Sequence, residues 1–320
     1  MDAIELRPLT LGELLDRAFT LYRRDFWLYV GIMAIPAALT VPFTVLIFSA
    51  QNAGAAGATP SLANIGWLIF VGLTFLVLSG IVYPMAMGAT TFAVSQSYLG
   101  QTATVRGAYG KVRGKVGRIW TAVFVAWLRA FGMIFLIALG AGIILGVVSA
   151  IVGVMARGRS PQLIGGVVLV GAFLVYLVAL VLGGVWALRY AVCIPALLLE
   201  NLGSLESLRR SVQLTQNRRW QIFVAVLLAG IIGYVGVLVF QGPFFVTMMF
   251  AQRAGRVPPW ITFSYAVSGA VGGAITGPVL IIVLVLLYYD TRIRKEAFDL
   301  QFMMSTLDNP APAQGTPSPA

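Results

Sequence analysis

The sequence has 320 residues, of which 59% are hydrophobic and only 10% charged, with a formal net charge of +11. Soluble globular domains carry about a quarter charged residues, so this composition excludes that class and predicts an all-α polytopic membrane protein. One cysteine and no histidine argue against a disulfide framework, a metal site or a cofactor, and we attribute the positive charge to the membrane rather than to nucleic acid.

Six apolar runs are long enough to cross a bilayer, which needs about 20 residues per helix. Residues 26–105, 220–252 and 257–289 contain no charge at all. The first run is not followed by a small-residue cleavage site, so we expect an uncleaved anchor rather than a signal peptide. In chain order, the predicted spans are Trp27–Ala50, Ile65–Ala93, Trp120–Met155, Leu163–Ile194, Trp220–Phe250 and Thr262–Tyr289.

The basic residues are distributed unequally between the two sets of connecting segments. One set carries sixteen lysines and arginines, and the opposite set carries four. Because basic segments stay on the cytoplasmic side, this asymmetry predicts that both termini are cytoplasmic.

The sequence also suggests a threefold internal repeat. Segments 11–21 and 205–214 match at several positions when they are aligned on Trp27 and Trp220, and the segment before Trp120 matches less well. We predict one amphipathic interfacial helix and two spans per repeat. The expected organisation is a single six-span domain at 1–305, with repeats at about 8–100, 101–200 and 201–300, followed by a disordered Pro-rich tail at 306–320.

Each repeat is predicted to begin with an amphipathic helix. In the first, apolar residues recur at helical spacing from Leu11 to Tyr22, opposite Glu13, Asp16 and Arg17. A helix of this kind is expected to lie in the headgroup plane with its apolar face in lipid. The three helices are either positioning elements or a cytoplasmic ring that binds anionic lipid.

Arg129 and Arg189 are the strongest candidate ligand contacts, because a charge within a predicted span indicates function. One interpretation is that they form an anion or lipid-headgroup clamp, with Glu200 and Asp290 as their partners when no ligand is bound. The alternative is that both arginines lie at the inner interface and reach the headgroups by snorkelling.

Two further patterns concern the last span. Gly269, Gly273 and Gly277 form a small-residue face, which predicts tight helix packing within one chain or across a homo-oligomer. The mixed charges after this span predict a helical extension with ion pairs four residues apart. The expected pairs are Arg292–Glu296 and Lys295–Asp299.

Three motifs resemble a known bacterial family. They are residues 7–24, residues 195–200 before 208–211, and residues 288–299. Together they resemble the membrane domain associated with glycerophosphoryl diester phosphodiesterases and related stand-alone membrane proteins. The resemblance implies the bacterial plasma membrane. It also implies that phosphodiesterase chemistry belongs to a separate barrel domain that uses histidines and metal-binding carboxylates, which this chain does not supply.

We therefore expect an integral membrane protein that is not an enzyme and is structural or lipid-interacting. Its expected partners are membrane lipids, including anionic phospholipid, and another membrane protein or a second copy. The alternative is a transporter or flippase for an anionic lipid or small anionic solute, which internal repeats and broken helices favour. An intramembrane enzyme is disfavoured because paired carboxylates and a Ser–His arrangement are missing.

Overall fold

The computed structural model describes residues 9–54, 62–155, 161–254 and 257–296, and the predicted tail at 306–320 and Asp299 lie outside them. The described residues are helical and contain no strand, which confirms the all-α class. The elements are α1 (Leu11–Arg24), α2 (Phe26–Gly54), α3 (Leu62–Tyr98), α4 (Val105–Arg113), α5 (Val116–Met155), α6 (Pro161–Ala187), η1 (Leu188–Tyr190), α7 (Cys193–Leu199), α8 (Ser204–Thr215), α9 (Arg219–Arg253) and α10 (Pro259–Glu296).

Six helical segments are long and apolar enough to cross a membrane, as the sequence predicted. The chain is a multi-pass membrane protein. The predicted fourth span is not one continuous helix, because α6 ends at Ala187 and the chain continues through the short 3-10 helix η1 into α7. The internal prolines of α2, α3, α9 and α10 are accommodated within long helices.

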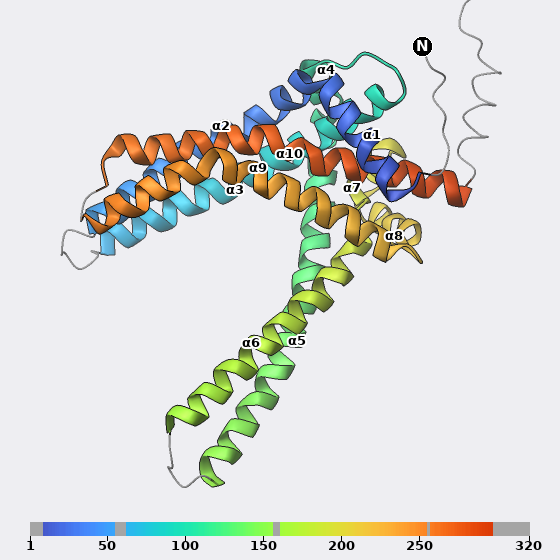
Figure 1. Cartoon of the computed structure of the whole chain (residues 1–320). Coiled ribbons are helices and arrows are strands. Elements are labelled where there is room, and N and C mark those ends of the chain that lie inside the picture. Colours follow the sequence, from blue (N-terminus) through green and yellow to red (C-terminus); the bar gives the residue numbers. More distant parts are fainter. Residues whose placement is uncertain (1–8, 55–61, 156–160, 255–256, 297–320) are drawn as a thin grey trace, which may run out of the picture.

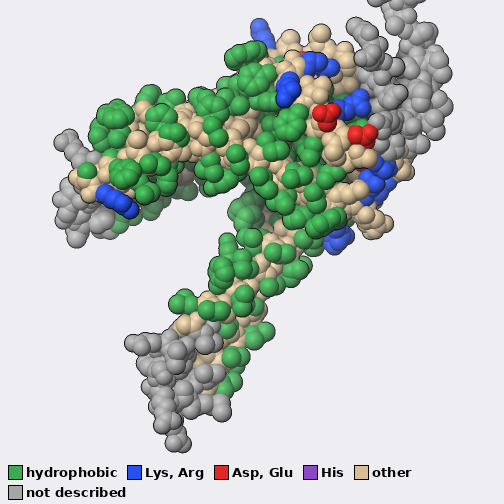
Figure 2. All heavy atoms as spheres, in the orientation of Figure 1, with side chains coloured by type: hydrophobic (Ala, Val, Ile, Leu, Met, Phe, Trp, Pro, Cys, Tyr) green, Lys and Arg blue, Asp and Glu red, His purple; other side chains and the backbone are tan. Residues whose placement is uncertain are grey.

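The long helices form two groups. Helices α2, α3, α9 and α10 pack together, with α10 against both α9 and α2. The hairpin of α5 and α6 diverges from this four-helix bundle in a second direction (Figure 1). Hydrophobic side chains cover both groups, and most of the visible charges gather where the groups meet (Figure 2). We call that region, with α1, α4, α7 and α8, the charged end.

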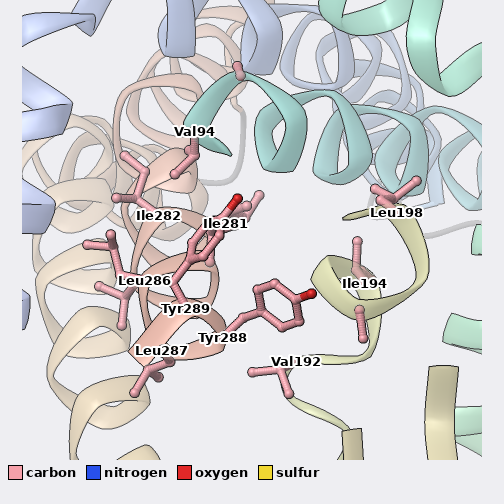
Figure 3. Close-up of a cluster of buried hydrophobic side chains, with 14 of the residues drawn as sticks. Val94, Val192, Ile194, Leu198, Ile281, Ile282, Leu286, Leu287, Tyr288 and Tyr289 are labelled. Atoms are coloured by element: carbon pink, nitrogen blue, oxygen red, sulfur yellow. The ribbon is translucent and has the colours of Figure 1, made fainter. Parts of the chain in front are cut away.

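The hydrophobic core lies at this charged end rather than evenly along the spans. The second half of α10 is its centre, because Ile282, Leu286 and Tyr288 are at most 1% exposed. Around them, α3 contributes Val94 and the α7 region contributes Leu198 (Figure 3). Farther from the charged end, α10 keeps several buried residues, and Met248, Val257 and Ile261 form a small second cluster. The other long helices have few buried side chains there, as expected of surfaces that face lipid.

The three amphipathic helices pack on protein. Their buried apolar residues belong to the main core, so the expectation that these faces enter lipid is wrong. Each helix packs mainly on an element of another predicted repeat: α1 on α10, α4 on α3, and α8 on η1 and α7. The apolar residues buried on these helices are Leu14, Ala18 and Leu21 in α1, Ala108 and Val112 in α4, and Leu208 and Leu214 in α8.

A tyrosine of α4 offsets the disruption that a proline causes in α2. Pro36 has no N–H group, so the carbonyl of Ile32, four residues earlier, loses its helical partner. The Tyr109 hydroxyl donates a hydrogen bond of 2.8 Å to this carbonyl. Burial raises the pKa of Tyr109 to about 12, which keeps the hydroxyl protonated as a donor.

Removing this hydroxyl is expected to lower stability. Tyr109→Phe leaves the Ile32 carbonyl without its side-chain donor, which should reduce the free energy of unfolding by about 1–2 kcal/mol. Unfolding by SDS titration in mild detergent measures the change. Tyr176→Phe is the control, because Tyr176 is 57% exposed on α6. Equal stability of the two variants would contradict the assigned role of Tyr109.

Candidate functional site

The two carboxylates predicted to lie near Arg129 and Arg189 pair with other arginines. Asp290 and Glu200 are each the centre of an ion-pair cluster at the charged end. Their partners come from α8, from the start of α9 and from α10. The expected pairing of these carboxylates with Arg129 and Arg189 is therefore replaced by different contacts.

Asp290 is 4% exposed and receives hydrogen bonds from three separate parts of the chain. Its carboxylate accepts from Arg218 at 3.0 Å, from Arg294 at 2.9 Å and from the backbone N–H of Leu9 at 2.8 Å. Arg294 also donates to the Leu9 carbonyl at 2.7 Å. This cluster joins the residues before α1 to the start of α9 and the end of α10.

A second cluster surrounds Glu200, in the turn between α7 and α8. Its carboxylate accepts from Arg210 and from the Tyr288 hydroxyl, each at 2.8 Å. Arg210 also pairs with Glu296. Arg292 donates to Glu296 at 3.0 Å, which confirms that predicted pair on α10. These contacts hold α7, α8 and α10 together, so we interpret both clusters as structural.

Arg129 and Arg189 are left available for another role. The guanidinium of Arg129 lies 6.0 Å from the centre of the Tyr190 ring, and that of Arg189 lies 5.5 Å from the Trp186 ring. Within the described part of the chain, neither arginine forms an ion pair. The Nε atom of Arg189 is buried and has no hydrogen-bond partner there. A buried donor without an acceptor is costly. The Arg189 residue as a whole is only half-buried, so other atoms of its side chain are able to contact an external anion.

An apolar cavity of about 290 Å³ lies at the base of the α5–α6 hairpin, and its wall includes Ala130 and Tyr190, the neighbours of Arg129 and Arg189, but not the arginines themselves. We call it the elbow cavity. It is lined by residues of α3, α5, the segment 187–195 and α10. Tyr190, whose ring lies beneath Arg129, is one of its walls. The cavity thus has an apolar interior, and the Arg129 guanidinium lies next to its wall. The wall includes Thr91, Trp127, Phe131, Tyr190 and Ile281.

The predicted glycine face of α10 borders a second cavity, of about 410 Å³, which α2, α3 and α9 also line. A Cβ atom at Gly273 would meet nothing within 4 Å, whereas one at Gly269 would meet the Gln241 side chain. One at Gly277 would only touch Met33, at 3.8 Å. The close approach to the α9 backbone is made at Gly272, where a Cβ would lie 3.3 Å from the Val237 Cα atom.

Sequence comparison finds one family match within the chain. Residues 161–291 match the family described as the membrane domain of glycerophosphoryl diester phosphodiesterase. The resemblance seen in the sequence motifs is confirmed over this range. The match covers Arg189, Glu200 and Asp290 but not Arg129. Comparisons with curated proteins and with solved structures found no match.

The matched family is a membrane domain and not a catalytic one. Among the residues that the structure describes, no group of three His, Cys, Asp or Glu side chains could hold a metal ion. The Arg218–Asp290 pair was missed from the sequence because its two residues lie 72 positions apart, and the Arg210–Glu296 pair also joins distant segments. The Arg294–Asp290 pair was missed although its spacing of four residues on one helix was an available signal.

Proposed function

We propose that the protein is a non-enzymatic lipid-interacting membrane protein that holds one anionic phospholipid at the elbow cavity. In this proposal the charged end faces the cytoplasm of a bacterial cell. The apolar cavity takes part of an acyl chain, and Arg129 and Arg189 contact the phosphate of the headgroup. The observation that carries the proposal is the combination of an apolar cavity with two arginines outside the ion-pair clusters, one having a buried donor without a partner.

The composition of the site favours a lipid over a small soluble anion. Both arginines lie beside aromatic rings, and the cavity is lined almost entirely by carbon. A small hydrated anion would gain little from such a wall, whereas an acyl chain is stabilised there by burial of apolar surface. Juxtamembrane arginines contribute about 1 kcal/mol each to attraction of anionic lipid. With the charged end on the cytoplasmic side, as proposed, Arg129 and Arg189 would lie at the level of the inner-leaflet headgroups.

Native mass spectrometry of protein released from mild detergent tests this function. The parent chain is expected to retain an anionic phospholipid, and the Arg129→Ala/Arg189→Ala double variant is expected to lose it. Arg209→Ala is the matched control, because Arg209 is an exposed arginine of α8 at the same end of the molecule. It should keep the adduct.

Two results would contradict the proposal. One is a parent chain without any specific phospholipid, and the other is a double variant that retains the same lipid as the control. In either case the arginines are interfacial anchors. A retained small anionic metabolite, lost from the double variant alone, would keep the arginine contacts but exclude the lipid.

Transfer of an anionic lipid between leaflets is the second candidate function. The position of the elbow cavity favours it, because the cavity lies at the base of the α5–α6 hairpin, where this hairpin diverges from the bundle (Figure 1). Proteoliposomes with fluorescent phosphatidylglycerol and an external quencher measure such transfer. Transfer that is lost in the double variant would support this function. Transfer no faster than in protein-free liposomes would exclude it.

A further inference from the structure

The helical hairpins α2–α3, α5–α6 and α9–α10 extend from the charged end by similar lengths. The part of α3 from Leu62 to Pro84 contains 23 residues, the part of α10 from Pro259 to Pro278 contains 20, and the part of α5 from Gly132 to Met155 contains 24. At 1.5 Å per residue these parts are about 34, 30 and 36 Å long. Each therefore matches a hydrocarbon thickness of about 30 Å.

The three hairpins differ in how extensively they pack against one another. The α2–α3 and α9–α10 hairpins share a long interface through α2 and α10. In the α5–α6 hairpin, none of the 18 residues in the most apolar window of α5 is buried. Hairpins of equal reach that leave one body must run nearly parallel to cross the same flat bilayer. The divergent direction of α5–α6 (Figure 1) therefore differs from its expected direction in a membrane.

Each helix of this hairpin has a position next to the elbow cavity where the helix can bend. In α5 this position is Gly132, beside Ala130 and Phe131 of the elbow cavity, and a Cβ added there would meet nothing within 4 Å. In α6 the helix gives way to the 3-10 helix η1 at Leu188–Tyr190, next to Ala187 of the same cavity. Glycine positions and 3-10 segments are where long helices bend.

The packing of the other hairpins indicates where a moving hairpin would go. In the bundle, α10, the last helix of the α9–α10 hairpin, lies along α2, the first helix of the α2–α3 hairpin. The α5–α6 and α9–α10 hairpins would pair in the same way through α6, the last helix of one, and α9, the first helix of the other. Helix α9 already contacts η1 at the base of α6. Large apolar residues on both helices are exposed beyond that contact, including Val178 on α6 and Val239 on α9. They are able to face each other after closure.

We propose that the described parts of the α5–α6 hairpin beyond the pivot, 132–155 and 161–187, form a hinged arm that turns about Gly132 and η1 and closes toward α9. Closure makes the three hairpins nearly parallel and brings α6 toward α9 at the pivot, where the elbow cavity lies. The inference rests on helix geometry and does not require that a lipid is bound. In the proposed function the arm controls access of the acyl chain to the cavity.

Double electron–electron resonance in lipid nanodiscs tests the hinge. Spin labels are placed at Val178→Cys and Val239→Cys in a Cys193→Ala background, because Cys193 is the one native cysteine. The parent should show a short-distance population that the divergent structure does not contain. Gly132→Ala stiffens α5 at the pivot and should reduce this population at least twofold, whereas Gly142→Ala, also in open space, should leave it unchanged.

Several outcomes would overturn the hinge. A single long distance in nanodiscs means that the arm does not close. Equal distance distributions for Gly132→Ala and Gly142→Ala remove Gly132 as the pivot. A short distance that disappears on dilution with unlabelled chain would assign the contact to a second copy. None of these results depends on lipid retention, so failure of the hinge and failure of the lipid site can be told apart.

Discussion

Asp290→Asn is expected to lower the free energy of unfolding by about 3 kcal/mol. The substitution keeps the size of the side chain but removes the negative charge that Arg218 and Arg294 share. Breaking a buried ion pair costs about 3–5 kcal/mol because a charge remains without a partner. The lower end of the range applies, since the side chains of Arg218 and Arg294 stay 24% and 28% exposed.

The pKa of Arg218 indicates how much this arginine depends on Asp290. Burial lowers it, with a further contribution from the charge of Arg294, and the charge of Asp290 opposes both effects. Without Asp290, two neighbouring arginines repel each other near the start of α9. SDS titration of parent and variant measures the loss. Asp16→Asn is the control, because Asp16 is exposed on α1. A loss no larger than that of the control would show that the cluster does not hold the charged end together.

Gly272→Leu is expected to lower the free energy of unfolding by about 2–3 kcal/mol. A Cβ at this position would lie 3.3 Å from the Cα of Val237 and from the Cβ of Phe240. The Val237 atom is part of the backbone, so α9 and α10 must separate to make room. Overpacking of this kind costs about 1–3 kcal/mol in well-packed cores, and a whole leucine side chain places this variant at the upper end.

Gly273→Leu is a control one residue away. Its side chain enters the second cavity, of about 410 Å³, where a Cβ meets nothing within 4 Å. Both variants gain the same helix propensity, since leucine is about 1 kcal/mol better than glycine in a helix. The difference between them therefore isolates the contact with α9. Equal stability of the two variants would contradict the close packing at Gly272.

The features that the sequence predicted correctly are those that depend on local composition. The six spans follow from runs without charge, and the Arg292–Glu296 pair follows from helical spacing of four residues. The family resemblance was carried by short motifs, two of which lie wholly or partly within the matched range 161–291. The amphipathic helices were also predicted, and the capping box of α1 between Thr10 and Glu13 fixes the start of the first.

The features that the sequence did not predict depend on which elements meet. The sequence pattern of α1 would be the same whether its apolar face entered lipid or packed on α10. The periodicity therefore predicted the helix but not the surface against which it packs. Similarly, the repeat of Gly269, Gly273 and Gly277 indicated a small-residue face, but the close backbone contact is made by Gly272, one residue off that face. The contacts of Asp290 with Arg218 and of Glu200 with Tyr288 were hidden because they join distant segments.

Photo-crosslinking of a phospholipid at the elbow cavity is the most direct test of the central claim. Phosphatidylglycerol with a diazirine on its acyl chain is added to the protein in nanodiscs, and the labelled peptides are mapped by mass spectrometry. We expect labels near Thr91, Trp127, Phe131 and Tyr190, all on the cavity wall, and fewer of them in the Arg129→Ala/Arg189→Ala variant. Labels spread only over exposed faces of the spans, such as Leu169–Leu182 on α6, and unchanged in the variant, would contradict the lipid site.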